Sequence, residues 1–227
     1  MGIEAMLLFA HSTGGYVAAH YAMTHPNRVL RLVLHGVAGL GSHPASTPDC
    51  ARSDGTGARK SSMISKLVRS PLWDAGIMNF GLIQRLGRFA KEPGRKRFKQ
   101  FQAYRAGITD DEELDLFYEY FWTALCGRPL SSDSWVNAFL IFIDSTEHQG
   151  LYARRPIADE PAERLALLPP TMVIYGQYDW VRTPSALRAA EMLPNFTLHQ
   201  VPNAHHHLYL DRPAVFCAFA EEVVNGL

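Results

Sequence analysis

The sequence predicts an α/β protein in which a parallel sheet is interrupted by a helical insertion. Short aliphatic runs bounded by turn residues alternate with helical segments at both ends of the chain, which is the order of a parallel sheet. In the middle, apolar residues recur at three- and four-residue spacing, the period of an amphipathic helix. We therefore expect a partial α/β core from residues 1–38 and 151–227, with residues 39–150 forming a flexible loop and a helical lid.

The N-terminal segment predicts the first βαβ unit of this core. The aliphatic run 6–9 is typical of a strand, and the small residues of 16–23 favour a helix that Pro26 ends. Residues 29–34 are rich in aliphatic side chains and predict a second strand. Because a strand, a turn, a helix and a strand follow one another within about 30 residues, we expect the two strands to be parallel.

The middle of the chain is different in composition. Residues 41–62 are rich in Gly, Ser, Pro, Thr and Ala, which predicts a mobile loop. The spacing of aliphatic and aromatic residues then predicts helices over 72–86, 114–125 and 135–142. Since no strand alternation interrupts this region, we expect the insertion to be entirely helical.

The α/β pattern returns in the C-terminal third. Strands are predicted at 171–175 and 196–201. Between them, Thr183 and Pro184 are typical of the N-cap and the first position of a helix. A final helix is expected to open at 211–213, with its apolar residues on one face.

Ser12 lies in the turn between the first predicted strand and the helix that follows it. A nucleophile elbow has this context, because its sharp turn holds a serine Oγ at the carboxyl end of a sheet. Such a turn is strained and needs small residues two before and two after the serine, where this chain has Ala10 and Gly14. A glycine-rich turn without catalytic function is the alternative.

A nucleophilic serine needs a base, and the base needs a carboxylate that orients it. Asp179 follows one predicted strand and the run 205–207 of three histidines follows the next, so both lie where parallel strands end. The backbone N–H of Thr13 is the candidate oxyanion donor. Three adjacent histidines do not converge easily on one ion, so we expect neither a metal site nor a cofactor.

With these motifs the chain resembles the α/β-hydrolase superfamily, and within it a subgroup of phospholipid-directed abhydrolases. That subgroup contains lysophospholipid and N-acyl-phospholipid hydrolases, lipase coactivators with lysophosphatidate acyltransferase activity, and cardiolipin deacylases. The resemblance rests on His-Ser-Thr-Gly-Gly-Tyr at 11–16, Tyr-Gly-Gln-Tyr-Asp-Trp at 175–180 and His-His-Leu-Tyr-Leu-Asp-Arg-Pro at 206–213. It implies that His206 is the catalytic base, and that His206 and Asp211 form the acyltransferase-like H-x4-D spacing.

The resemblance also has implications for the sheet. It implies a truncated α/β-hydrolase fold, a parallel half-sheet from strand 5 of that fold onward, with a helical lid. The loop after strand 3, which supplies another oxyanion-hole N–H in the family, would then be missing, leaving the N–H of Thr13. His205 departs from the family pattern, which usually has a small residue there.

These features predict a serine hydrolase that acts on phospholipid or lysophospholipid carboxylic esters. Ser12 would attack the ester, His206 would take its proton and Asp179 would orient His206. Water or a lysolipid hydroxyl would accept the acyl group, and the second acceptor would give lysophosphatidate acyltransferase activity. The alternative is a non-catalytic lipid-binding or lipase-regulatory pseudoenzyme; the intact triad favours the enzyme, and the missing strands favour the alternative.

Charge and composition restrict the partners. Lys+Arg and Asp+Glu are both 22, and this zero net charge argues against a protein held mainly by nucleic-acid phosphates. No apolar run approaches the roughly 20 residues of a membrane span. The three cysteines are widely spaced and no signal peptide is visible, so we expect a protein that is not secreted. We expect it in the cytoplasm or peripherally on a membrane, and the family resemblance implies mitochondria as a further location.

A basic run, Arg85–Lys99, lies in the predicted lid with aromatic and aliphatic residues interleaved. Such a run could contact an anionic membrane or a lipid droplet. The alternative is a solvated helical face with a turn at Pro93 and Gly94.

Overall fold

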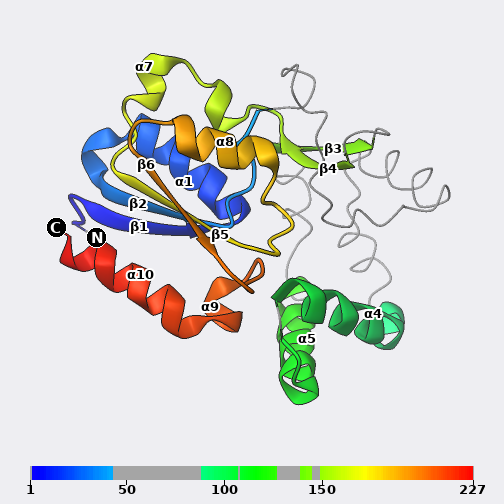
Figure 1. Ribbon diagram of the computed structural model, residues 1–227. Coiled ribbons are helices and arrows are strands. Elements are labelled where there is room, and N and C mark those ends of the chain that lie inside the picture. Colours follow the sequence, from blue (N-terminus) through cyan, green and yellow to red (C-terminus); the bar gives the residue numbers. More distant parts are fainter. Residues whose placement is uncertain (1, 43–87, 107, 127–138, 145–148, 227) are drawn as a thin grey trace. The chain divides into compact units, whose positions relative to one another are not determined.

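The computed structural model describes residues 2–42, 88–106, 108–126, 139–144 and 149–226 (Figure 1). The chain divides into two compact units. The first contains Met1–Thr47, Arg105–Gly107 and Arg155–Leu227, and the second contains Pro48–Tyr104 and Ile108–Arg154.

The first unit is built on a four-stranded sheet in the order β1-β2-β5-β6. All its neighbouring strands pair in parallel, which confirms the predicted α/β class with a parallel sheet. The strands are β1 (Met6–His11), β2 (Val29–His35), β5 (Thr171–Gly176) and β6 (Phe196–Val201). Every residue of β5 is buried, as expected for an inner strand covered on both faces.

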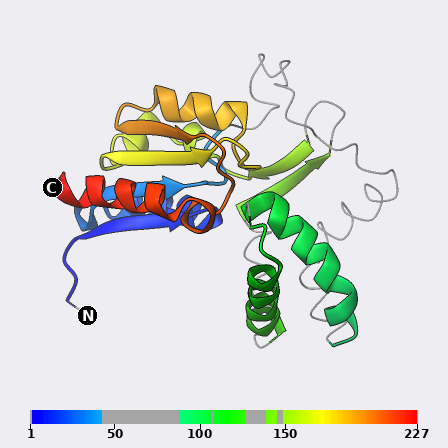
Figure 2. The ribbon, with the colours of Figure 1, turned by 60° about the horizontal axis from the view of Figure 1, so that its bottom comes forward.

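Helices cover both faces of this sheet, and Figure 1 shows α1 and α8 on one side and α10 on the other. In Figure 2 the ribbon is turned so that the face that carries α10 comes forward. The α10 side packs on Val33, Met172 and Ile174. On the opposite face, Gly15 of α1 lies against Leu34 of β2. Leu34 follows Val33 directly along the strand, so the two side chains point to opposite faces of the sheet. The helical elements of the unit are α1 (Thr13–Thr24), η1 (Pro26–Arg28), η3 (Ile157–Asp159), α7 (Ala162–Leu165), α8 (Pro184–Met192), α9 (Leu208–Asp211) and α10 (Pro213–Asn225).

The second unit contains a helix pair, α4 (Arg88–Ala106) and α5 (Asp111–Cys126). Phe98 of α4 packs on Tyr118 and Phe121 of α5, with ring centroids 5.1 and 4.7 Å away. The turn expected at Pro93 and Gly94 is wrong, because both residues lie within α4. The expected helix over 72–86, and the expected loop over 41–62 apart from Gly41 and Ser42, lie outside the described residues.

The expectation of an entirely helical insertion is also wrong. Residues predicted as part of a helix instead form β3 (Leu140–Asp144), which pairs antiparallel with β4 (Gln149–Ala153). The run Leu-Ile-Phe-Ile in β3 is β-branched and aromatic, and runs this short do not distinguish a strand from a buried helix by spacing.

Over the described part of the chain, no helix combines the length and the apolar character that crossing a membrane requires.

Candidate active site

Ser12 occupies a strained turn between β1 and α1. Its backbone has φ 55° and ψ −127°, a conformation that residues other than glycine rarely adopt. The surrounding backbone fixes this conformation: the Ser12 N–H donates to the carbonyl of His35 at 3.0 Å, and the Ser12 carbonyl accepts from Gly15 and Ala38. Strain held in this way is typical of functional positions.

The small residue that this turn requires is Gly15 and not Gly14. Apart from its chain neighbours and the backbone of its own helix, no atom of the described residues lies within 4 Å of where a Cβ on Gly14 would be, so the expected crowding at Gly14 is wrong. A Cβ on Gly15 would lie 2.9 Å from Cγ2 of Val37. The reason is that α1 packs closely on the segment that follows β2.

The structure brings Ser12, His206 and Asp179 together at the carboxyl ends of the strands. The distance from Ser12 Oγ to His206 Nε2 is 3.0 Å, and that from His206 Nδ1 to Asp179 Oδ1 is 2.9 Å. Asp179 Oδ1 also accepts from the backbone N–H of Val181 at 3.0 Å. The ring of Trp180 stands edge-on to His206, and both His206 and Asp179 are buried. Such a chain can move a proton from the hydroxyl to the imidazole.

Thr13 is the first residue of α1, directly after Ser12. Backbone N–H groups in the first turn of a helix have no partner within the helix. The Thr13 N–H therefore has no partner within the helix, and its role as an oxyanion donor stays a prediction.

Sequence reasoning missed Gly36, which lies against the Asp179–His206 pair. Its φ is +52°, and a Cβ there would be 2.8 Å from Asp179 Oδ2 and 2.9 Å from His206 Nδ1. Asp179 Oδ2 is buried without a hydrogen-bond partner among the described residues. Only glycine leaves room for the pair as it stands. A glycine directly after a strand was the available signal in the sequence.

Asp211 contacts His205 and does not contact His206. Its Oδ2 accepts from the backbone N–H of His205 at 2.7 Å and lies 2.9 Å from His205 Nδ1. The H-x4-D spacing of His206 and Asp211 therefore does not correspond to a hydrogen bond between the two side chains. Asp211 instead closes the loop that carries His206. The neighbouring His207 has its Nδ1 2.9 Å from the hydroxyl of Tyr209.

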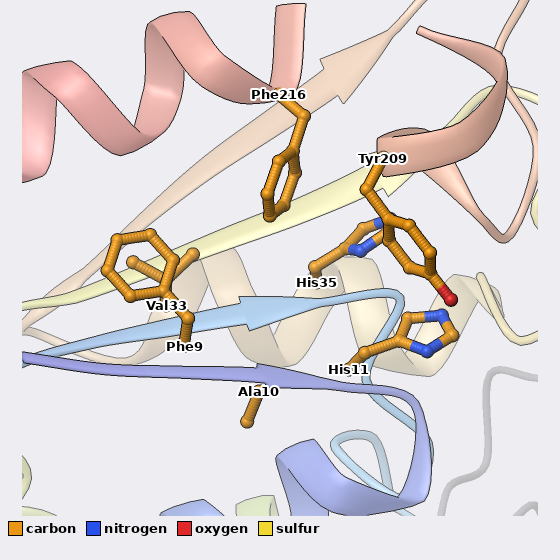
Figure 3. A pocket seen from close by; sticks show the side chains of 7 residues that line it. All are labelled: Phe9, Ala10, His11, Val33, His35, Tyr209 and Phe216. Carbon is orange, nitrogen blue, oxygen red and sulfur yellow. The ribbon is translucent and has the colours of Figure 1, made fainter. Parts of the chain in front are cut away.

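Two further histidines, His11 and His35, lie beside this loop and were also missed. They line a small, largely apolar pocket in the first unit, which Figure 3 shows. The pKa of His11 is lowered to about 4 and that of His35 to about 3, mainly by burial and in part by neighbouring histidine rings. Both side chains are therefore neutral near pH 7. The pocket is lined by Phe9, Ala10, His11, Val33, His35, Tyr209 and Phe216.

Within the described residues, no group of three or more His, Cys, Asp or Glu side chains is arranged to hold a metal ion.

The basic run of the predicted lid is engaged in ion pairs between α4 and α5. Arg95 contacts Asp115 at 3.0 Å and Glu119 at 2.5 Å, and Lys99 contacts Asp111 at 2.6 Å. Lys91 also pairs with Glu119. Lys96 is exposed, while Arg85 and the side chain of Arg97 lie outside what the structure describes. Contact of this run with an anionic surface stays a prediction.

Comparison with known proteins identifies relatives that act on phospholipids. The family described as "alpha/beta hydrolase fold" matches residues 1–213. The chain is 30% identical to a (lyso)-N-acylphosphatidylethanolamine lipase of Mus musculus, covering all of this chain and 60% of the relative. It is 28% identical to a 1-acylglycerol-3-phosphate O-acyltransferase of Arabidopsis thaliana, covering 94% of this chain and 48% of the relative. These names confirm the resemblance to the phospholipid-directed subgroup.

The chain thus spans from about half to 60% of the length of these relatives. Among solved structures, a bacterial membrane phospholipase A is similar with a TM-score of 0.59 and 18% identity, over 99% of this chain and 58% of that one. A serine hydrolase of Cycloclasticus zankles is similar with a TM-score of 0.58 and 15% identity, over 99% of this chain and 65% of that one. At these identities the two structures show a shared fold.

Proposed function

Since the chain belongs to the alpha/beta hydrolase fold family, we propose that it is a serine hydrolase of lipid carboxylic esters whose catalytic triad is Ser12, His206 and Asp179. One observation carries the proposal: the hydrogen-bonded chain from Ser12 Oγ through His206 to Asp179, with links of 3.0 and 2.9 Å. A nucleophile, a base and an orienting carboxylate in this arrangement are the groups that acyl transfer requires.

The proton positions follow from the partners. Asp179 Oδ1 is a carboxylate oxygen and only accepts, so the proton of a neutral His206 is on Nδ1 and donates to it. His206 Nε2 is then free to accept the proton of the Ser12 hydroxyl. This is the tautomer that a general base needs, and the buried carboxylate stabilises the imidazolium that forms.

The reaction proceeds in two halves. Ser12 Oγ attacks the ester carbonyl while His206 Nε2 takes the hydroxyl proton, and the Thr13 N–H stabilises the charge that develops on the carbonyl oxygen. His206 then returns the proton to the leaving alcohol, and the acyl group stays on Ser12. In the second half an acceptor hydroxyl loses its proton to His206 and attacks the acyl-enzyme, which releases Ser12 with its proton restored.

The acceptor decides which activity results. Water as acceptor gives a hydrolase, which the relatives named as lipases support. A lysophosphatidate hydroxyl as acceptor gives an acyltransferase, which the relative named as a 1-acylglycerol-3-phosphate O-acyltransferase supports. Both activities use the same acyl-enzyme, so the proposal for the triad is common to them.

The experiment that tests the triad compares Ser12→Ala with the unchanged chain on a short-chain aryl ester and on N-acylphosphatidylethanolamine in vesicles. Turnover should fall by on the order of 10⁴-fold or more, because the nucleophile has no substitute. Ser185→Ala on α8 is the matched control and should leave turnover unchanged. Turnover that survives Ser12→Ala would refute the mechanism. Vesicle binding without turnover by the unchanged chain would favour the non-catalytic alternative.

A further inference from the structure

Two histidines that the proposed reaction does not use, the half-buried His11 and the buried His35, bind the backbone of the loop that carries His206. His11 is the last residue of β1 and His35 the last residue of β2, so both side chains start from the end of a sheet strand. Figure 3 shows the two imidazole rings side by side in the pocket next to Tyr209. Their ring centroids are 4.8 Å apart, and the His11 ring lies 4.5 Å from the ring of His206.

Each histidine satisfies a different backbone group of the loop. His11 Nε2 lies 2.9 Å from the carbonyl oxygen of His206, and a carbonyl only accepts, so His11 donates from Nε2. His35 Nε2 lies 3.3 Å from the backbone N–H of Leu208, which only donates, so His35 accepts at Nε2. The two neighbouring rings are therefore opposite tautomers with opposite roles.

The His35 contact requires a neutral ring. A protonated His35 would direct an N–H at the N–H of Leu208 and lose the bond. Burial, which holds the pKa of His35 far below neutrality, keeps the acceptor available. His35 Nδ1 has no hydrogen-bond partner among the described residues. A buried polar atom left without a partner is costly, so the Leu208 bond is made at some expense in stability.

The loop is consequently held at successive points. Asp211 binds His205, His11 binds the carbonyl of His206, and His35 binds the N–H of Leu208. His206 and His207 lie between the outer two points, and His206 Nε2 must remain within hydrogen-bond distance of Ser12 Oγ.

We propose that His11 and His35 are positioning residues, which set the location of His206 relative to Ser12 by fixing the two peptide groups that follow His206. This rests on the proposed triad. A loop free to shift by about 1 Å would lengthen the Ser12–His206 bond, and misplacement of that size costs on the order of 10²-fold in rate. Because a displaced His206 impairs proton transfer from Ser12, we expect the loss to fall on kcat.

The test compares two replacements at His35. His35→Gln places an amide oxygen near the position of Nε2 and keeps an acceptor for Leu208, whereas His35→Leu keeps apolar bulk and removes the acceptor. We expect His35→Leu to lower kcat by about 10- to 100-fold with little change in KM, and His35→Gln to retain most of the kcat. His199→Leu, on β6 and away from the loop, is the matched control for loss of a half-buried histidine.

Amide hydrogen exchange at Leu208 provides a readout that needs no catalysis. Exchange should become faster in His35→Leu and stay near that of the unchanged chain in His35→Gln. His11→Leu and His11→Gln form a second pair of variants, in which only glutamine can donate to the His206 carbonyl. If thermal melting shows that His35→Leu is unfolded, the same measurements on this second pair replace it.

The outcomes separate this inference from the triad. Equal kcat losses in the Leu and Gln variants, or an unchanged kcat in the Leu variants, would overturn the positioning role even where Ser12→Ala is inactive. Survival of turnover in Ser12→Ala would overturn the triad, whatever the His35 variants show. Faster exchange at Leu208 together with an unchanged kcat would mean that the two histidines only stabilise the fold, which also overturns the proposal.

Discussion

Gly36→Ala is the sharpest perturbation of the site that the structure offers, because one added carbon would collide with two proposed catalytic side chains. The new Cβ would lie 2.8 Å from Asp179 Oδ2 and 2.9 Å from His206 Nδ1. Both distances are shorter than van der Waals contact with carbon, so the carboxylate, the ring or the backbone must move. The substitution changes no group that takes part in proton transfer.

Two effects of different size are expected. The backbone of Gly36 has φ +52°, and a residue with a Cβ in the left-handed region costs about 1–2 kcal/mol of stability. In a chain of this size, that lowers the melting temperature by roughly 2–8 °C. Displacement of His206 or Asp179 by several tenths of an ångström to 1 Å lowers kcat by on the order of 10²-fold. Activity should therefore fall far more than the folded fraction does.

The assay measures kcat on an aryl ester and the melting temperature of the same preparation. The proton that His206 Nδ1 donates to Asp179 gives a downfield proton NMR signal, and this signal should shift or disappear in Gly36→Ala. Gly14→Ala is the matched control, because no described atom beyond its chain neighbours and its own helix backbone lies within 4 Å of the added carbon. A Gly36→Ala variant with unchanged kcat and an unchanged downfield signal would refute the argument that glycine is required there.

Other predictions concern charge. His11 and His35 have pKa values of about 4 and 3 in the folded chain, below the ordinary value of 6.5, so their stabilisation is complete above pH 6.5 and is lost as pH falls toward 4. Urea unfolding between pH 6.5 and 4.5 should show His35→Gln reducing this pH dependence by about 1.4 kcal/mol per pH unit, and an unchanged slope would contradict a buried neutral His35. Asp211→Asn should lower hydrolysis and acyl transfer by the same factor, measured as product ratios with a labelled acyl donor; a changed ratio would show that Asp211 acts on the acceptor. Arg95→Glu should lower the melting temperature more than Lys96→Glu does, because Arg95 has acidic partners on α5. If Lys96 contacts anionic vesicles, Lys96→Glu should weaken cosedimentation with them, and an unchanged bound fraction would argue against that contact.

The strands of the sheet and the positions of Ser12, Asp179 and the histidine run 205–207 could be predicted because each depends on local sequence. The choice of His206 within that run came from the family resemblance. Aliphatic runs bounded by Gly or Pro specify strands, and a parallel sheet brings all their carboxyl ends to one edge. A polar residue directly after such a strand is therefore placed near the others without any knowledge of side-chain packing. That is why residues far apart along the chain could be assigned to one site.

The supporting residues could not be predicted in the same way, because their roles depend on what approaches from a distant part of the chain. Gly36 is unremarkable until Asp179 and His206 lie against it. His35 is the last residue of an ordinary strand until the N–H of Leu208, 173 positions later, needs an acceptor. The wrong prediction of a helix where β3 forms has a local cause. The apolar run of β3 is too short for its spacing to distinguish the period of a strand from that of a helix.

Sequence spacing was also insufficient to identify the partner of Asp211. The H-x4-D spacing suggests His206, but the Asp211 carboxylate binds the neighbouring His205. The proposed base, His206, has Asp179 as its partner. A second carboxylate on His206 is not needed for either proposed activity, because hydrolysis and acyl transfer share the same attack by Ser12 and the same acyl-enzyme. They diverge only when water or a lysolipid hydroxyl reaches that intermediate. Exclusion of water above Ser12 is what favours the lysolipid. We therefore expect the partition to depend on what covers Ser12, and Asp211, which holds the loop that both proposed reactions use, should leave the partition unchanged.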